Sequence, residues 1–230
     1  AESRGHANLG WLDANYSFSF ASYFNPKRMN FGALRVLNDD TISPGKGFGT
    51  HPHDNMEIIT IPLKGDLEHK DSMGNIGAIN EGEIQVMSAG TGVYHSEYNK
   101  NSNEFINLLQ LWITPNKLNV NPRYDQLSIK ELKKKNSFYQ ILSPYPEDEG
   151  VWINQDAWFH LGDFEELTSI DYVLKQKGNG VYVFVIKGVF KVANENLRKR
   201  DALGIWNTNK ISFEAQCKSQ VLLVEVPMKI

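Results

Sequence analysis

The sequence predicts an all-β protein with a sandwich or barrel architecture, and three observations support this. Short runs of β-branched, aromatic and aliphatic residues recur along the chain, turn sequences separate them, and helical periodicity is scarce. The 230 residues correspond to about one and a half average domains, so one large β domain or two small ones would fit. Many short strands at this spacing are typical of sandwiches and barrels.

Turn residues such as Asn38-Asp39-Asp40 lie between or beside the expected strands. The best helical candidate is Leu127–Lys135, in which the run Lys133–Lys135 is expected to be a solvated face, because three lysines are too few for a nucleic-acid footprint. In chain order, the expected strands are Phe31–Leu37, Met56–Leu63, Ile84–Met87, Ile106–Ile113, Tyr182–Ile186 and Val221–Val226.

Composition excludes several classes of protein. The chain has 24 Lys and Arg against 27 Asp and Glu, which gives no reason to expect a nucleic-acid or anionic-membrane surface. The longest apolar run, Val181–Ile186, is too short to span a bilayer. The single cysteine, Cys217, excludes an intrachain disulfide and a cysteine-based zinc cluster. No secretion signal is visible, so we expect a cytoplasmic monomer without a membrane or nucleic-acid partner.

The sequence repeats one pattern. Ile59–Leu67 resembles Val183–Phe190, since each contains a strand, a Lys-Gly turn and a second strand. Asn107–Pro115 resembles Gln220–Pro227, since each is a strand that ends in proline. The two separations differ by roughly ten residues, which indicates two related β units with loops of different length. We expect the first unit at residues 1–130 and the second at 131–230, joined within the proline-rich segment 115–150.

Two short segments carry residue types that bind metals. His51 and His53 lie in one segment, and His95 and Glu97 lie in the other. Residues i and i+2 of a strand point to the same side, so each pair shares a face, and two such pairs on facing strands would converge on one point. Three imidazoles and a carboxylate suit a divalent ion of Fe, Ni, Cu, Co, Mn or Zn. The sequence therefore predicts a metal site in the first unit.

These segments resemble the two motifs of the cupin superfamily. Gly45–Glu57 holds a glycine, the His-Pro-His triplet and a glutamate, and Gly82–Asn99 holds the second motif. Their departures from the general cupin pattern, including Ser88 in place of proline, are those of pirins, whose second motif reads Gly-x-Gly-x-x-His-Ser/Ala-Glu. The chain resembles bacterial pirin-like quercetin 2,3-dioxygenases over nearly its whole length. Further agreement lies in Arg4–Asp13, Phe31–Asp40, His69–Asn75 and Asn121–Tyr124.

The resemblance implies a bicupin, with two antiparallel jelly-roll barrels packed face to face and one metal in the first barrel. It places the metal ligands on His51, His53, His95 and Glu97, with Fe(II) as the expected ion. Glu57 occupies the ligand position of many other cupins but is not expected to bind the metal here.

The second unit is expected to lack a metal. The internal repeat places Leu174 and Gln176 opposite the first histidine pair. It places Phe213 and Ala215 opposite His95 and Glu97, so no ligand set is present.

The resemblance implies a metal-dependent dioxygenase that opens the heterocyclic ring of a flavonol such as quercetin and releases carbon monoxide. Its substrates are then a flavonol-like aromatic molecule and dioxygen. Glu97 is the candidate base for the flavonol 3-hydroxyl, since it alone among the ligands accepts a proton while remaining at the site. Phe48, Met87 and Tyr94 are candidate pocket walls.

Two other functions stay open. Some pirins resemble iron-redox-sensitive regulators, so the alternative is an interaction protein with a regulatory protein partner. The third function is isomerase chemistry on a sugar-like ligand, as in other cupins.

The remaining histidines and the cysteine are expected to play structural roles. His69 is expected to be structural or exposed, and His6 is expected to anchor the N-terminal segment. His160 lies among aromatic residues, and Cys217 lies in a polar stretch as a plain small side chain.

Overall fold

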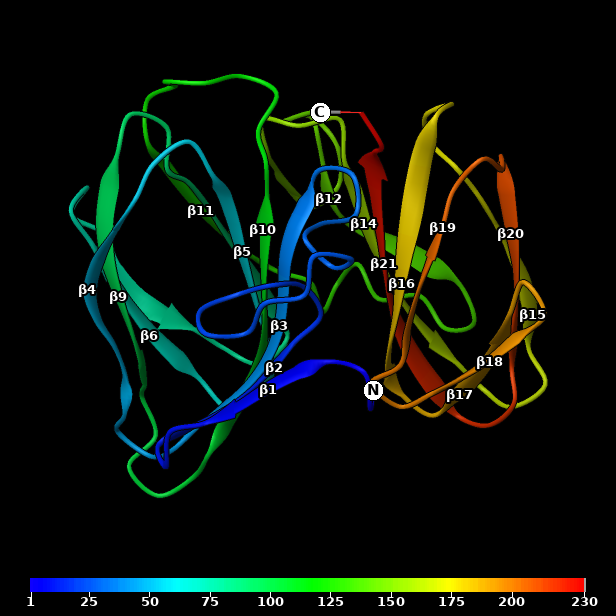
Figure 1. Cartoon of the computed structure of the whole chain (residues 1–230), viewed down its shortest axis with the longest axis horizontal. Coiled ribbons are helices and arrows are strands. Elements are labelled where there is room, and N and C mark those ends of the chain that lie inside the picture. Colours follow the sequence, from blue (N-terminus) through cyan, green and yellow to red (C-terminus); the bar gives the residue numbers. More distant parts are fainter. Residues whose placement is uncertain (230) are drawn as a thin grey trace.

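The computed structural model describes residues 1–229, which contain no helix and therefore none that could cross a membrane. The strands form four sheets, two in each half of the chain. In Figure 1 the two larger sheets lie side by side in the middle of the molecule, and the two smaller sheets lie at its outer ends.

The N-terminal half pairs a seven-stranded sheet with a four-stranded sheet. The larger sheet contains, in order, β1 (Gly5–Asn8), β2 (Leu12–Tyr16), β3 (Leu34–Ile42), β10 (Ile106–Ile113), β5 (Glu57–Lys64), β8 (Glu83–Ser88) and β11 (Arg123–Ser128). The smaller sheet contains β4 (Gly47–His53), β9 (Val93–Asn99), β6 (Leu67–Asp71) and β7 (Ile76–Ile79).

The C-terminal half pairs a six-stranded sheet with a second four-stranded sheet. The larger sheet contains β13 (Val151–Trp152), β12 (Phe138–Ser143), β14 (Trp158–Phe164), β21 (Ser219–Pro227), β16 (Asn179–Lys187) and β19 (Ala202–Ile205). The smaller sheet contains β15 (Ser169–Val173), β20 (Lys210–Ala215), β17 (Val189–Val192) and β18 (Glu195–Arg198).

This is the all-β bicupin fold that the sequence predicts, with one difference. Each half consists of two open sheets packed face to face as a jelly roll, where closed barrels were expected. The repeated Lys-Gly turns lie at equivalent places, from β5 into β6 and from β16 into β17. Gly65 and Gly188 have φ of 78° and 81°, a left-handed conformation that glycine adopts at little cost. The boundary between residues 130 and 131 stays a prediction.

The largest hydrophobic core lies between the two larger sheets. Ile59 of β5 and Leu111 of β10 pack there in one cluster with Phe184 of β16 and Leu222 of β21. Alternate residues of β10 point the other way, and Leu108 belongs to a separate core within the N-terminal half. These central strands are therefore covered on both faces, which explains their continuous apolar sequences.

The first expected strand was placed wrongly. The expected segment was Phe31–Leu37, but the observed strand, β3, begins at Leu34. It continues through Asn38, Asp39 and Asp40, which were expected to form a turn. Their backbones pair with both β2 and β10, and their side chains have tertiary partners that local sequence does not reveal. Asp39, for example, forms ion pairs with Arg4 at 3.1 Å and with Arg200 of the C-terminal half at 3.3 Å.

The helix expected over Leu127–Lys135 is also wrong. Leu127 and Ser128 extend β11, which pairs with β8, and turns follow. The segment is too short to form a stable helix by itself, and Ile129 and Leu132 are held instead against the core between the two larger sheets.

Candidate metal centre

Strands β4 and β9 bring three histidines together. His51 lies directly opposite His95 in the antiparallel pair, and His53 lies two residues further along the same face. The ring centroids are 4.9 Å apart for His51 and His53, 4.4 Å for His51 and His95, and 4.9 Å for His53 and His95. One ring nitrogen from each lies within 4.8 Å of the other two, so the three side chains are placed to share one ion.

Burial keeps the rings of His53 and His95 neutral, as metal binding requires. Burial lowers the pKa of His95 to about 3, with further lowering by His51 and His69. Burial, together with His95 and His51, lowers the pKa of His53 to about 4. His51 Nδ1 lies 2.7 Å from the carbonyl oxygen of Gly49, and because that oxygen only accepts, Nδ1 carries the hydrogen and Nε2 keeps its lone pair.

His95 supplies a direct test of whether the site fits a metal. Its side chain is buried, yet neither ring nitrogen has a hydrogen-bond partner among the described residues. A buried polar atom without a partner is costly, and such atoms in a native protein usually have an ion, a water molecule or a ligand as partner. Three imidazoles beside a carboxylate are a donor set that suits a first-row divalent metal ion. The residues present therefore fit such an ion.

Glu97 lies next to this cluster but not within it. Its carboxylate is buried and accepts hydrogen bonds from Gln110 Nε2 at 2.8 Å and from Thr60 Oγ1 at 3.4 Å. One Glu97 oxygen, one His95 nitrogen and one His69 nitrogen lie within 4.8 Å of one another. His51, His53 and His95 form a separate set of three with the same spacing, so His95 is the residue that the two sets share. Coordination of one ion by all four predicted ligands therefore stays a prediction.

A hydrogen-bond chain fixes the orientation of Gln110. Trp112 Nε1 donates to Gln110 Oε1 at 3.3 Å, which turns the amide nitrogen of Gln110 toward Glu97. The same Trp112 ring lies 4.9 Å from the ring of His53. The chain therefore joins the histidine cluster to the carboxylate. The tryptophan and the glutamine were missed in the sequence, although both lie on one strand with the parity that faces the site.

Gln110 belongs to a polar row that crosses the larger N-terminal sheet. Asn38 of β3 and Thr60 of β5 lie opposite Gln110, and Gln85 of β8 lies opposite Thr60. Asn38, Thr60 and Gln85 are buried, and Gln85 Nε2 has no partner among the described residues. Beside this row, burial and the carboxylates of Asp39 and Glu97 raise the pKa of Asp40 to about 8, so Asp40 is protonated at neutral pH.

His69 is the residue that sequence reasoning placed least well. It is buried, so the exposed alternative is wrong. It lies opposite Glu97 in the β6–β9 pair, and its Nε2 lies 3.0 Å from Asp71 Oδ2. With the hydrogen on Nε2, Nδ1 keeps a lone pair, and this atom has no partner among the described residues. The signal was available, since Leu67, His69 and Asp71 alternate along one face of β6.

Other predicted residues lie where their chemistry suggests. Glu57 is buried and accepts from Ser88 Oγ at 2.6 Å and from Asn154 Nδ2 at 3.0 Å, outside the histidine cluster. His6 Nε2 lies 3.1 Å from Asp13 Oδ1 in an exposed pair between β1 and β2.

The predicted pocket walls differ from one another. The Phe48 ring lies 6.5 Å from the His51 ring, and Met87 is buried beside Ile58. Tyr94 is 57% exposed, because alternation along β9 turns it away from His95. Phe48 and Met87 remain candidate walls, and Tyr94 lies on the outer face of its strand.

The equivalent region of the C-terminal half has a different chemistry. Phe213 and Ala215 are buried in its hydrophobic core, and Leu174 packs against that core. His160 is also buried, with Nδ1 3.3 Å from Tyr172 Oη. The absence of a metal from this half stays a prediction.

Comparison with known proteins gives consistent relatives over the whole chain. The pirin family matches residues 1–113, and the quercetinase C-terminal cupin domain matches residues 140–226. Quercetin 2,3-dioxygenase of Escherichia coli strain K12 is 43% identical to this chain, and the matched region covers 99% of this chain and 96% of that protein. A pirin-like protein of Caulobacter vibrioides is 36% identical over 96% of this chain and 95% of its own. The crystal structure of the E. coli pirin YhhW in complex with nickel(II) superimposes with a TM-score of 0.94 at 40% identity, covering 100% of this chain and 97% of that one.

Proposed function

Because this chain belongs to the pirin family of the cupin superfamily, we propose that it is a metal-dependent dioxygenase that opens the heterocyclic ring of a flavonol. The observation that carries this proposal is the cluster of His51, His53 and His95, in which neither nitrogen of the buried His95 has a partner within residues 1–229. The name of the E. coli relative, a quercetin 2,3-dioxygenase, supports the substrate class.

We propose His51, His53, His95 and Glu97 as the ligands of one divalent ion, with Fe(II) as the physiological metal. The nickel(II) complex of the E. coli pirin supports metal binding by this chain. When bound, the ion would lower the pKa of a coordinated flavonol hydroxyl and supply an open position for chemistry with dioxygen. The chain's own contribution begins with His53 and His95, whose lowered pKa values mean that they need no proton loss before they bind.

Glu97 then has a second role as the acceptor of the flavonol 3-hydroxyl proton. Its carboxylate is held by Gln110 and Thr60 through side-chain donors, so its position is fixed before the substrate arrives. Phe48 supplies apolar surface near His51, which would favour an aromatic ring over water.

The test measures oxygen uptake by the metal-loaded protein on a panel of flavonols, with metal content determined on the same samples. Glu97→Gln keeps a coordinating oxygen but removes the basicity, so it should lose about 10²- to 10⁴-fold in turnover while retaining part of the metal. His53→Ala should lose the metal itself. Glu68→Gln is the matched control, since Glu68 is exposed on β6 beside the buried His69.

Two outcomes would contradict the proposal. If Glu97→Gln with full metal occupancy turns over at the wild-type rate, Glu97 is not the base. If the wild type loaded with each candidate metal consumes no oxygen on any flavonol, the dioxygenase assignment is wrong and the interaction-protein function takes its place.

A further inference from the structure

A cavity lies between the two halves, apart from the histidine cluster. Its volume is about 780 Å³, which is within the range of cavities that bind small organic molecules. The end of β5, the turn between β7 and β8 and the segment Ile129–Lys135 form one side, and β12, β14, β16 and β21 form the other. None of the three histidines lines it.

The inner surface of this cleft contains apolar side chains beside polar ones. Ile61, Leu161 and Ile186 line it and are also members of the buried core between the two larger sheets. Tyr139 lies with them, and its hydroxyl donates to Asp163 Oδ2 at 3.0 Å. The accessible apolar wall comes from the partly buried Leu63, which packs against the same core, and a ligand with an apolar body would cover it.

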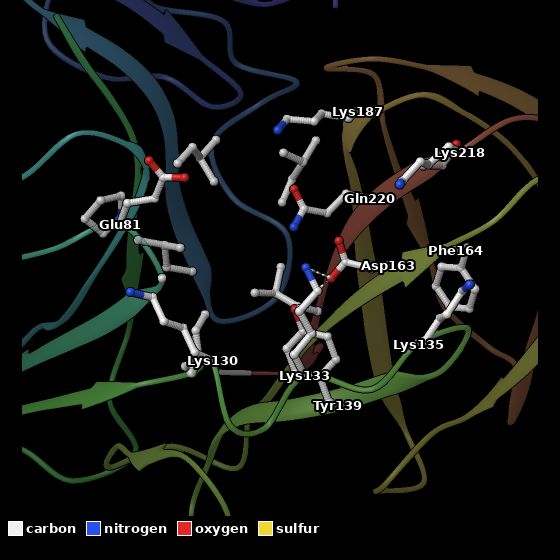
Figure 2. A pocket seen from close by; sticks show the side chains of 18 of the residues that line it. Glu81, Lys130, Lys133, Lys135, Tyr139, Asp163, Phe164, Lys187, Lys218 and Gln220 are labelled. Atoms are coloured by element: carbon white, nitrogen blue, oxygen red, sulfur yellow. Dashed lines mark hydrogen bonds and ion pairs between the residues drawn. The ribbon is translucent and has the colours of Figure 1, made fainter. Parts of the chain in front are cut away.

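The opening of the cleft carries excess positive charge, although the whole chain has a net charge of −3. Figure 2 shows lysine side chains on several sides of the opening, with Lys133 bonded to Asp163. The carboxylates that line the cleft are Glu81, Asp163 and Glu165, and the lysines are Lys130, Lys133, Lys135, Lys187 and Lys218.

Two of these lysines are free to bind a ligand. Lys133 pairs with Asp163 at 3.3 Å, and Lys135 and Lys218 share Glu165 at 3.5 and 3.9 Å. Lys130 and Lys187 form no ion pair within residues 1–229. They lie on opposite sides of the cleft, at the start of the connecting segment and at the end of β16.

From this arrangement we propose that the cleft binds an organic anion, with its apolar body against the wall that includes Leu63 and its acidic group between Lys130 and Lys187. The acidic group is a carboxylate, sulfonate or phosphate, because an ammonium donor pairs with each of these as a point charge. Because the lysines are near the surface, we expect binding to weaken at high ionic strength. The ligand would contact both halves of the chain at once.

The experiment compares two fluorescent probes that differ in one group. 8-Anilinonaphthalene-1-sulfonate carries the anion, and N-phenyl-1-naphthylamine has the same rings without the sulfonate. Titration at low salt should give a dissociation constant for the sulfonate about tenfold smaller than for the neutral probe. High salt should remove most of that difference.

Variants locate the site. Lys130→Gln with Lys187→Gln should weaken the sulfonate about tenfold and leave the neutral probe unchanged, since glutamine keeps length but not charge. Lys70→Gln with Lys191→Gln is the matched control, because both lysines are exposed on other strands and neither lines the cleft. His53→Ala should bind the sulfonate like the wild type.

The proposal is overturned if both probes bind equally well. It is also overturned if the control pair weakens sulfonate binding as much as the cleft pair does, or if His53→Ala abolishes binding. None of these outcomes depends on dioxygenase activity, so the cleft and the proposed function are tested separately.

Discussion

Replacement of Gln110 by leucine tests how the protein positions Glu97. Gln110 Nε2 donates to Glu97 Oε2 at 2.8 Å, and the carboxylate is only 3% exposed. A hydrogen bond to a buried charged group contributes about 1.5–3 kcal/mol. Converted at about 1.4 kcal/mol per factor of ten, this corresponds to roughly 10- to 100-fold weaker metal binding for Gln110→Leu, if Glu97 is a ligand.

The assay is competition for the metal against a chelator of known affinity, with urea unfolding of the metal-free protein as a separate measure of stability. Gln85→Leu is the matched control. Gln85 is buried in the same polar row, but within the described part of the chain its amide nitrogen has no partner and it makes no bond to Glu97. We expect its metal affinity to stay within about threefold of wild type. Equal losses in the two variants, or no loss in Gln110→Leu, would refute the reasoning.

Three further predictions follow from the same contacts. Burial, aided by Lys175, lowers the pKa of His160 from 6.5 to about 3 in the folded state. As the pH falls below 6.5, the unfolded state therefore binds a proton that the folded state does not, and the free energy of unfolding decreases. His160→Phe should therefore reduce the loss of unfolding free energy between pH 7 and pH 5 by roughly 2 kcal/mol, as measured in urea. Arg200→Met should cost about 2 kcal/mol in the same assay without changing metal content, because Asp39 loses one of its two ion-pair partners. Metal should raise the melting temperature of the wild type but not of His53→Ala, because a ligand of the folded state stabilises only a protein that binds it.

The central strands β5, β8, β10, β16 and β21 were predictable because their apolar runs are long enough to act locally. The expected segment Ile106–Ile113 matches β10 residue for residue, and the Lys-Gly turns mark equivalent corners in both halves. The errors occurred where a distant partner decides the outcome. Asp39 sits in a strand because Arg4 and Arg200 pair with it, and neither arginine is near it in the sequence.

The sequence by itself determined the all-β class and the two related units. It also determined that His51 shares a strand face with His53, and His95 with Glu97. These features depend on strand parity and turn chemistry, which are set by neighbours along the chain. Only the tertiary structure decided which side chains surround these residues. Gln110, Thr60 and His69 come from three other strands, and strand register rather than local spacing sets them beside Glu97. The cleft between the halves depends on how two sheets pack, which a periodic pattern in either sheet does not encode.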